Sequence, residues 1–274
     1  MFNLERWIEI YQSIRKNKLR AVLSGFTVSL GILLFIILFG LGEGLKNSYE
    51  DLFLNEANNL IAIYPGKTTK PFGGYKSNRR IEFENSDITD IINNFSSSIE
   101  YINPTINASE SITYKLESFS YSIEAVSPSN QFMRKHVLMN GRYINILDIN
   151  KKNKVAVIGR LVARDIFKQE DPLGKFINIG SRTFKVVGVF QDSGGDVEES
   201  KVIIPYTTRQ QILMGTDKLG NIALTFNPDI GSSGAIALSD NLKKFLKKKK
   251  SIDPTDPSGL FIRNVADEFE RSMQ

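Results

Sequence analysis

The sequence contains no cysteine and only one histidine among its 274 residues. The absence of cysteine excludes thiol catalysis, cysteine-based metal sites and disulfides, although it does not decide the compartment, because many extracytoplasmic domains also lack disulfides. A single histidine, His136, excludes a metal cluster built from several imidazoles. We therefore expect no metal or other cofactor, and we expect His136 to have an ordinary surface or core role.

The sequence also lacks a phosphate-binding loop and a convincing catalytic carboxylate pair. The segment PGKTT, at 65–69, resembles the end of a phosphate loop, but such a loop needs a glycine at the position of Ile61. Several acidic residues lie among glycines and a proline, and we expect them in solvated turns: Asp171, Asp192, Asp196, Glu198 and Glu199. These observations predict a chain that is not itself an enzyme.

The net charge of +5 is concentrated in the first 20 residues and in the run KKFLKKKK at 243–250. The simplest interpretation of the lysine run is the solvated face of a helix, and contact with anionic lipid headgroups or an acidic partner is the alternative. The basic N-terminal segment lacks interleaved aromatic residues for base stacking, so we expect no nucleic-acid partner.

A long apolar run follows the basic segment. No residue from Ala21 to Gly42 is charged, and 14 of these 22 residues are Val, Leu, Ile or Phe. At 1.5 Å per residue the run would make roughly 33 Å of helix, which matches a hydrocarbon core of about 30 Å. Because a secretory signal has an apolar core of only about 7–15 residues, the sequence predicts an uncleaved membrane anchor.

The charges that flank the run predict its orientation. Four basic residues directly precede it, and Lys46 is the only basic residue close behind it; the four are Arg15, Lys16, Lys18 and Arg20. The positive-inside rule then places the N-terminus in the cytoplasm of a bacterial cell and the bulk of the chain outside the inner membrane. The lipid bilayer is thus the first expected partner.

The first residues show the spacing of an amphipathic helix. Leu4, Trp7, Ile8 and Tyr11 fall on one face, with charged residues elsewhere. This helix is expected either to lie on the inner leaflet or to offer a docking surface to a cytoplasmic partner.

The region after the apolar run mixes strand and helix patterns without strict alternation, which predicts an α+β domain. Strands are expected at about 58–66, 99–114, 119–126, 154–159, 201–205, 221–226 and 259–264, with a hairpin over 176–190. Helices are expected at about 84–95, 160–167, 206–215, 232–250 and 265–274. The first of these should begin near Asn85 or Ser86, with Ile88, Ile91 and Ile92 on one side.

Four stretches of the sequence closely resemble MacB-type ABC transporter permeases. They are IYQSIRKNKLRAVLSGFTVSLGILLFIILFGLGEG at 10–44, MNGRYINILDINKKNKVAVIGRLVARDIF at 139–167, DPLGKFINIGSRTFKVVGVF at 171–190 and VIIPYTTRQQILMG at 202–215. The most specific signal is the series GRY…D…VAVIG…A…F…DPLGK…I…G…F.VVGV, which covers Gly141–Val189 nearly continuously.

The resemblance implies the organisation of the chain. It implies a cytoplasmic amphipathic helix at 1–18, a transmembrane helix at 19–45 and a periplasmic core domain at 46–274. The core domain would have two lobes: a base lobe at about 55–109 plus 219–274, and an inserted β-rich lobe at about 110–218. Family members continue into three further transmembrane helices of an FtsX-like region, so we expect either a fragment of a longer permease or a second polypeptide that carries those helices.

The resemblance implies mechanical work rather than catalysis. A separate cytoplasmic ABC ATPase would bind Leu4, Trp7, Ile8 and Tyr11 and move the transmembrane helix, and the periplasmic lobes would follow to export a substrate. Four glycines of that helix would pack against neighbouring helices: Gly25, Gly31, Gly40 and Gly42. The expected partners are a second permease, identical or different, and a periplasmic adaptor.

Two alternative functions stay open at this point. One is lipoprotein release, as in the related LolC- and LolE-type permeases. The other is a truncated, membrane-tethered adaptor without transport activity.

Overall fold

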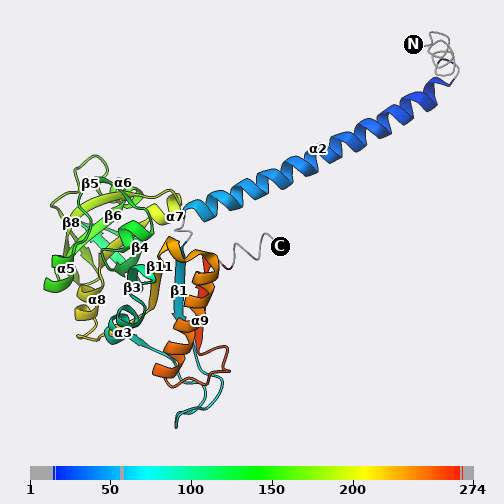
Figure 1. The fold of residues 1–274 in the computed structure, drawn as a ribbon. Helices are drawn as coiled ribbons and strands as arrows, with labels where there is room; N and C mark the ends of the chain where they lie inside the picture. Colours follow the sequence, from blue (N-terminus) through cyan, green and yellow to red (C-terminus); the bar gives the residue numbers. More distant parts are fainter. Residues whose placement is uncertain (1–14, 16, 56–58, 266, 268–274) are drawn as a thin grey trace. The chain divides into compact units, whose positions relative to one another are not determined.

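The structure, a computed structural model, describes residue 15 and residues 17–55, 59–265 and 267. The chain divides into two compact units, residues 1–52 and 53–274. The first contains helix α2 (Lys18–Asn55), and the second is a sheet-rich α+β domain, as predicted (Figure 1). We call the described part of the second unit, residues 59–265, the folded domain.

Helix α2 continues ten residues beyond the predicted end at residue 45. The first proline of the chain is Pro65, and no glycine occurs between Gly44 and Gly66, so no helix-breaking residue interrupts the segment after the apolar run. Most of the amphipathic helix predicted at 1–18 lies outside the described residues.

One ten-stranded sheet organises the folded domain, in the order β12-β1-β11-β3-β4-β9-β6-β8-β5, with β7 pairing both β3 and β8. The strands are β1 (Leu60–Pro65), β3 (Ile99–Tyr114), β4 (Glu117–Val126), β5 (Val137–Gly141), β6 (Val155–Gly159), β7 (Phe176–Ile179), β8 (Arg182–Gln191), β9 (Lys201–Pro205), β11 (Asn221–Phe226) and β12 (Leu260–Asn264). A separate two-stranded sheet joins β2 (Phe83–Glu84) to β10 (Lys218–Leu219).

Strand β3 connects two parts of this sheet. Its first half, Ile99–Thr105, pairs with β11, and its second half, Ile106–Tyr114, pairs with β4. Because β7 pairs with β3 as well as with β8, the strands β3, β4, β9, β6, β8 and β7 close into a hydrogen-bonded ring. A closed ring leaves no free strand edge within it.

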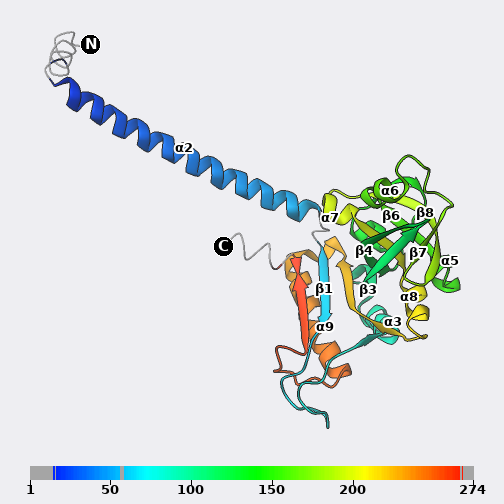
Figure 2. The ribbon, with the colours of Figure 1, turned by 180° about the vertical axis from the view of Figure 1, so that it is seen from behind.

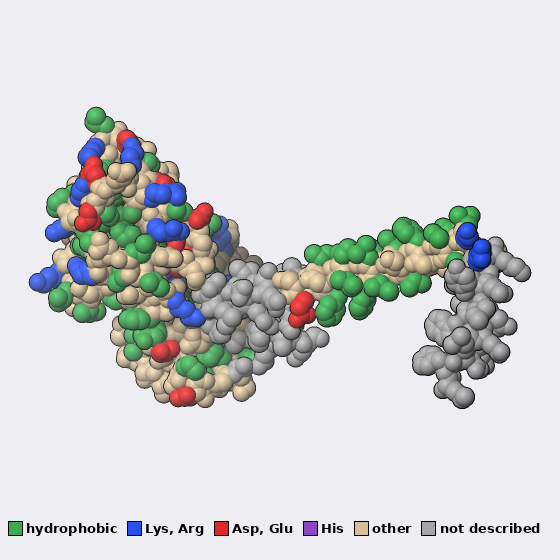
Figure 3. Space-filling view, turned by 90° about the horizontal axis from the view of Figure 1, so that it is seen from above, with side chains coloured by type: hydrophobic (Ala, Val, Ile, Leu, Met, Phe, Trp, Pro, Cys, Tyr) green, Lys and Arg blue, Asp and Glu red, His purple; other side chains and the backbone are tan. Residues whose placement is uncertain are grey.

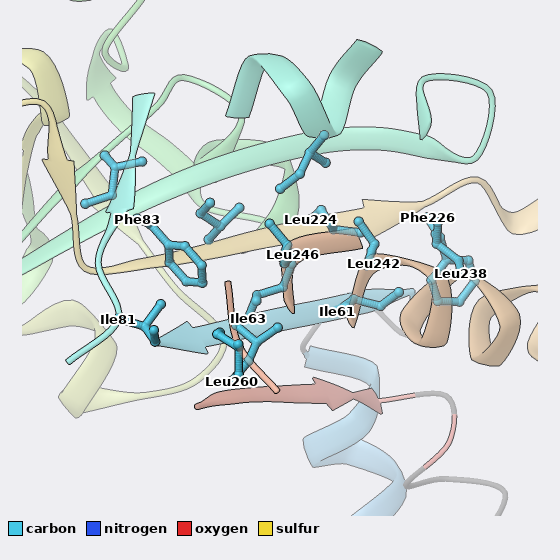
Figure 4. Close-up of a cluster of buried hydrophobic side chains, with 14 of the residues drawn as sticks. Ile61, Ile63, Ile81, Phe83, Leu224, Phe226, Leu238, Leu242, Leu246 and Leu260 are labelled. Carbon is cyan, nitrogen blue, oxygen red and sulfur yellow. The ribbon is translucent and has the colours of Figure 1, made fainter. Parts of the chain in front are cut away.

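The first part is a layer of helices on a four-stranded portion of the sheet, β12-β1-β11-β3. Helix α9 (Gly231–Lys249) presents Ala235, Leu238, Leu242 and Leu246 at helical spacing to Ile61, Ile63 and Leu224 of β1 and β11 (Figure 4). Helix α3 (Asn85–Phe95) adds Ile91 to the same cluster. Figure 2 shows α9 beside β1 from the opposite side.

The second part is the ring, which has an apolar core of its own. Side chains from its strands, such as Ile112, Ile158 and Phe184, pack with Val162 and Ile166 of helix α6 (Arg160–Phe167). The two clusters draw on residues 61–91 with 219–260 and on residues 112–204 respectively. The bounds of the two predicted lobes and their independent movement stay predictions.

Helix α3 differs in two details from its prediction. It is capped by Glu84, not by Asn85 or Ser86, because the Glu84 N–H donates to the Asp87 side chain at 2.8 Å in a capping box. Ile92 is 42% exposed, so only Ile88 and Ile91 of the three predicted isoleucines face the core.

Several short elements were not predicted: β2, β5, β10, α4 (Asn130–Met133), α5 (Ile146–Lys151), α7 (Asp196–Glu199) and the 3-10 helix η1 (Pro228–Ile230). Helix α8 (Tyr206–Ile212) is confirmed within the predicted 206–215. The last predicted helix, at 265–274, lies almost wholly outside the described residues.

The lysine run at 243–250 is not simply the solvated face of a helix, as the sequence predicted. Lys247 is buried, and its ammonium donates to the carbonyls of Pro254 at 2.8 Å and Asp256 at 2.6 Å. Lys249 and Lys250 contact the fully buried Asp87 carboxylate at 2.8 and 2.7 Å. The run therefore fixes the end of α9 to its neighbours, and only part of it faces solvent.

The buried carboxylate of Asp256 fastens the loop after β1. It accepts hydrogen bonds from the N–H groups of Thr69, Lys70 and Ser258 and from the Thr69 hydroxyl. Burial alone would raise the pKa of Asp256, but these four donors outweigh it and hold the pKa well below its usual range. The threonines of the PGKTT segment are thus held by a carboxylate within the chain.

We predict that this carboxylate makes folding sensitive to acid. Its folded-state pKa lies below the unfolded value of about 3.9, so its contribution is complete above about pH 5 and is lost as the pH falls through the folded pKa. Asp256→Asn should lower the free energy of unfolding by about 2 kcal/mol at pH 7, and by less at pH 3. Urea unfolding at both values checks this, with the exposed Asp240→Asn as the control; an equal loss at both values would contradict it.

Candidate functional site: the apolar helix and the signature segment

Helix α2 exposes apolar side chains around its whole circumference. Its segment Lys18–Gly44 is the one helix among the described residues that is long and apolar enough to cross a membrane, and none of its most apolar part is buried within the chain. Figure 3 shows apolar side chains along this helix and basic side chains at one end. Because water would be a poor solvent for such a surface, a bilayer is its natural surrounding.

The residues predicted to act at the membrane are only partly described. Arg15, Lys18 and Arg20 are exposed at the basic end of α2, as a headgroup contact requires. Lys16 and all four residues of the predicted ATPase-coupling face (Leu4, Trp7, Ile8 and Tyr11) lie outside the described residues. Their roles therefore stay predictions.

The four helix glycines have open surroundings. A Cβ atom built on Gly25, Gly31, Gly40 or Gly42 would meet no heavy atom within 4 Å. These positions are free to receive another helix at close range, and their role in packing against a second permease stays a prediction.

The segment Gly141–Val189, which we call the signature segment, supplies β6, β7 and most of β8 to the ring. Gly141 has φ +77°, and a Cβ atom there would lie 2.2 Å from the Val187 carbonyl oxygen. Its neighbour Arg142 forms two hydrogen bonds with the buried Asp148 carboxylate, at 2.6 and 3.2 Å. This carboxylate also caps α5 by accepting from the Asn145 N–H at 3.0 Å. These contacts fix the turn between β5 and α5.

Two more signature glycines sit where backbones touch. A Cβ atom on Gly159 would lie 2.0 Å from the Glu199 carbonyl oxygen, and one on Gly188 would lie 2.2 Å from that of Arg142. The Arg160 side chain, which follows Gly159, contacts the Glu199 carboxylate at 2.7 Å. The signature segment therefore specifies close packing of the ring.

A chain of buried polar groups joins the two parts of the domain. His136 bonds to the Asp192 carboxylate through Nε2 and to the Tyr143 hydroxyl through Nδ1, both at 3.1 Å. Tyr143 accepts from Asn130, Asn130 accepts from Asn103, and Asn103 accepts from the N–H and hydroxyl of Ser127. His136 thus has the predicted core role, and α4 is held against β3.

Asp192 and Glu199 correct the prediction of solvated turn residues. Asp192 is 8% exposed and Glu199 is 1% exposed, and each pairs with a basic group from a distant segment. Although burial opposes it, the hydrogen bond from His136 and that from the Gly194 N–H lower the pKa of Asp192. The neighbouring glycines led to the prediction of solvated turns. The ion pairs could not be predicted, because the partners lie far away in sequence.

The polar chain is not arranged for catalysis. The Ser127 hydroxyl is separated from His136 by Tyr143, Asn130 and Asn103, and within the described part of the chain only the tyrosine hydroxyl is hydrogen-bonded to the histidine. Burial raises the pKa of Tyr143, which keeps it protonated. No group of three or more metal-ligating side chains occurs among the described residues.

A small cavity adjoins this chain. It has a volume of about 120 Å³ and lies between helix α4 and one face of strands β1, β11 and β3. Its lining includes Asn103, Asn130 and Glu124. Pockets that enclose drug-sized ligands measure about 300–1,000 Å³. This cavity is therefore suited to water or to a small polar group.

The model of the MacB-like periplasmic core domain family matches residues 21–237. This chain belongs to that family. The match takes in both the apolar helix and the signature segment, which confirms the resemblance noted in the sequence.

Curated relatives lead to the same family. The chain is 30% identical over 240 residues to the macrolide export ATP-binding/permease protein MacB of Chlorobium luteolum, which covers 86% of this chain and 36% of that protein. It is also 30% identical over 233 residues to the MacB protein of Campylobacter jejuni, covering 81% of this chain and 35% of that protein. The chain thus spans little more than a third of the length of these relatives.

Solved structures share the fold of the core domain. The periplasmic region of MacB from Actinobacillus actinomycetemcomitans matches with a TM-score of 0.65 at 23% identity, over 81% of this chain and 95% of that one. The extracellular domain of the ABC-type transporter YknZ from Gram-positive bacteria matches with a TM-score of 0.62 at 14% identity, over 75% of this chain and all of that one. A MacB-like periplasmic core domain that follows an N-terminal apolar helix fits an inner-membrane location.

Proposed function

We propose that this chain acts as a permease subunit of a MacB-like ABC transporter, which transmits ATP-driven motion from a cytoplasmic ATPase to the periplasmic core domain for export of a substrate. The observation that carries the proposal is one continuous family match that joins the apolar helix to the core domain. A helix that is covalently continuous with a closely packed domain can pass displacement from one to the other.

Several features support the individual parts of this mechanism. The basic residues before α2 favour a cytoplasmic N-terminus, where an ATPase would bind Leu4, Trp7, Ile8 and Tyr11. The open surroundings of the helix glycines suit a second permease, identical or different. The two apolar clusters, which share the partly buried Ile106 and Tyr206, suit two lobes with bounds at about residues 109–110 and 218–219. These lobes would move against each other and contact a periplasmic adaptor.

Co-purification with an ABC ATPase from the same cell tests the proposal. The tagged chain, expressed at its native level and extracted in mild detergent, should retain such an ATPase and change its rate of ATP hydrolysis. Replacing Leu4, Trp7, Ile8 and Tyr11 by serine should reduce the retained ATPase by about tenfold, because a few central apolar side chains dominate most interfaces. Serine at Glu5, Arg6 and Glu9 is the matched control. A chain that neither retains an ATPase nor alters ATP hydrolysis would contradict the proposal.

A further inference from the structure

The loop after β1 is a hairpin with a basic and aromatic surface. From Lys67 to Arg80, which we call the finger, the chain carries five basic residues and no acidic one. Phe72 and Tyr75 lie at its tip and are 41% and 51% exposed. Exposed aromatic side chains among basic groups are typical of surfaces that bind other molecules.

The finger is held in one conformation. Phe72 and Tyr75 exchange backbone hydrogen bonds of 3.1 and 3.0 Å across Gly73 and Gly74, whose φ angles of +57° and +83° suit a tight turn. The Arg79 guanidinium lies 4.3 Å from the centre of the Tyr75 ring. It also donates to the carbonyls of Lys250 and Ser251 at the end of α9. A partner would therefore meet a surface that is already ordered.

Lysines of α9 extend this surface. Figures 1 and 2 both show the finger beside the C-terminal end of α9, and a Cβ atom on Gly73 would lie 3.3 Å from the Ser251 Cβ. Among the described residues, seven basic side chains of the finger and α9 form no ion pair: Lys67, Lys70, Lys76, Arg80, Lys243, Lys244 and Lys248. We call these seven side chains, with Phe72 and Tyr75, the basic-aromatic face.

Carboxylates among the described residues balance the charges of this face only in part. Asp253 accepts hydrogen bonds from Thr255 and attracts Lys70 without forming an ion pair with it. The other nearby acidic groups are already used: Asp87 and Asp90 pair with Lys249, and Asp256 is surrounded by N–H and hydroxyl donors. Lys244 and Lys248 are exposed and one helical turn apart, a spacing at which like charges repel. An anionic partner would relieve this repulsion.

Strand β1 fixes the position of the face within the folded domain. The chain enters the domain at Leu60, and β12 leads away from it at Asn264, which pairs with Ile61. The finger begins at the other end of β1, about 20 Å away at roughly 3.3 Å per residue. The face thus lies at the end of β1 opposite to Leu60.

We propose that the basic-aromatic face binds an acidic protein, one that offers a cluster of carboxylates and an apolar side chain for Phe72 and Tyr75. Lysine and arginine side chains would pair with the carboxylates and speed the encounter, and the two rings would supply the apolar contact. This proposal concerns the core domain alone and holds whether or not an ATPase drives α2.

A binding titration with a defined probe tests the proposal. The full chain in phosphatidylcholine nanodiscs is titrated against a fluorescent peptide of glutamate and leucine, and against the same peptide with glutamine in place of glutamate. The glutamate peptide should bind, with an affinity that falls as salt rises, and K67E/K76E/R80E should weaken it by about tenfold or more. Phe72→Ser should weaken it at high salt as well, because an apolar contact is not screened.

The matched control is K151E/K154E/K185E, which reverses three exposed charges that lie outside the finger and α9 and form no ion pair with another described residue. It should leave the affinity within about twofold, since these groups lie away from the face. Equal binding of the glutamine peptide, or an unchanged affinity in the finger variant, would overturn the proposal. A third outcome would also overturn it: the finger variant loses binding to phosphatidylglycerol vesicles but keeps binding to the peptide. The partner would then be a membrane surface.

Discussion

Gly141→Ala should lower the free energy of unfolding of the folded domain by about 4 kcal/mol or more. Two effects add at this position. The φ angle of +77° is unfavourable for any residue with a Cβ atom, and that atom would lie 2.2 Å from the Val187 carbonyl oxygen and 2.7 Å from the Leu173 side chain. The carbonyl belongs to β8 and accepts the Arg142 N–H at 2.9 Å, so it cannot withdraw without breaking this hydrogen bond to the turn after β5.

Gly174 offers a matched control, because its φ angle is also +77° but no atom lies closer to its Cβ position than the end of the Lys185 side chain at 4.0 Å. Gly174→Ala should therefore show the backbone strain alone, about 1–2 kcal/mol. Pulse proteolysis of the full chain in urea measures both. Equal losses in the two variants would mean that the contact with β8 is relaxed without cost, and the account of the signature segment as close packing would be wrong.

The strands of the ring could be predicted individually, but the ring itself could not. The continuous apolar runs at Val155–Gly159 and Lys201–Pro205 identify buried strands by local composition. In contrast, the pairing of Ile112 with Ile179 joins residues far apart in sequence, and no local period encodes it. Strand β5 was missed because it lies at the sheet edge and exposes most of its side chains, so it lacks an apolar pattern.

Charged pairs show the same limit at the level of single residues. The turn chemistry around Gly194 and Gly195 is visible in the sequence, but the burial of Asp192 and Glu199 depends on His136 and Arg160. The membrane helix is the opposite case, because its length and its flanking charges are local properties. The signature segment is intermediate between the charged pairs and the membrane helix. Its glycines can be recognised in the sequence, but the backbone carbonyl groups that leave no room for a side chain there cannot.

Removing the basic residues before α2 should invert the chain in the membrane. The N-terminal side owes its excess of positive charge mainly to Arg15, Lys16, Lys18 and Arg20. Replacing these four by glutamine, together with N47K/S48K, reverses the charge difference across the helix, and the positive-inside rule then favours an N-terminus outside. We expect a large share of such chains to place the core domain in the cytoplasm.

The chain is well suited to the measurement. It has no cysteine, and Leu116 at the turn between β3 and β4 is fully exposed, so Leu116→Cys introduces one reactive thiol on the core domain. A membrane-impermeant maleimide should label this thiol in intact spheroplasts of the parent. In the variant with four glutamines and N47K/S48K, the maleimide should label a large share of the chains only after permeabilisation.

Glutamine at Lys151, Lys152, Lys154 and Lys185 removes the same charge from the core domain and should leave the parent labelling unchanged, because only charges within about 15–20 residues of the membrane helix set orientation. Parent chains that react only after permeabilisation would place the N-terminus outside. The proposed coupling would then fail on physical grounds, since Leu4, Trp7, Ile8 and Tyr11 would be separated by the bilayer from any ATPase that uses cytoplasmic ATP. Under the proposed function, export by the variant with inverted charges should fall in proportion to the inverted fraction.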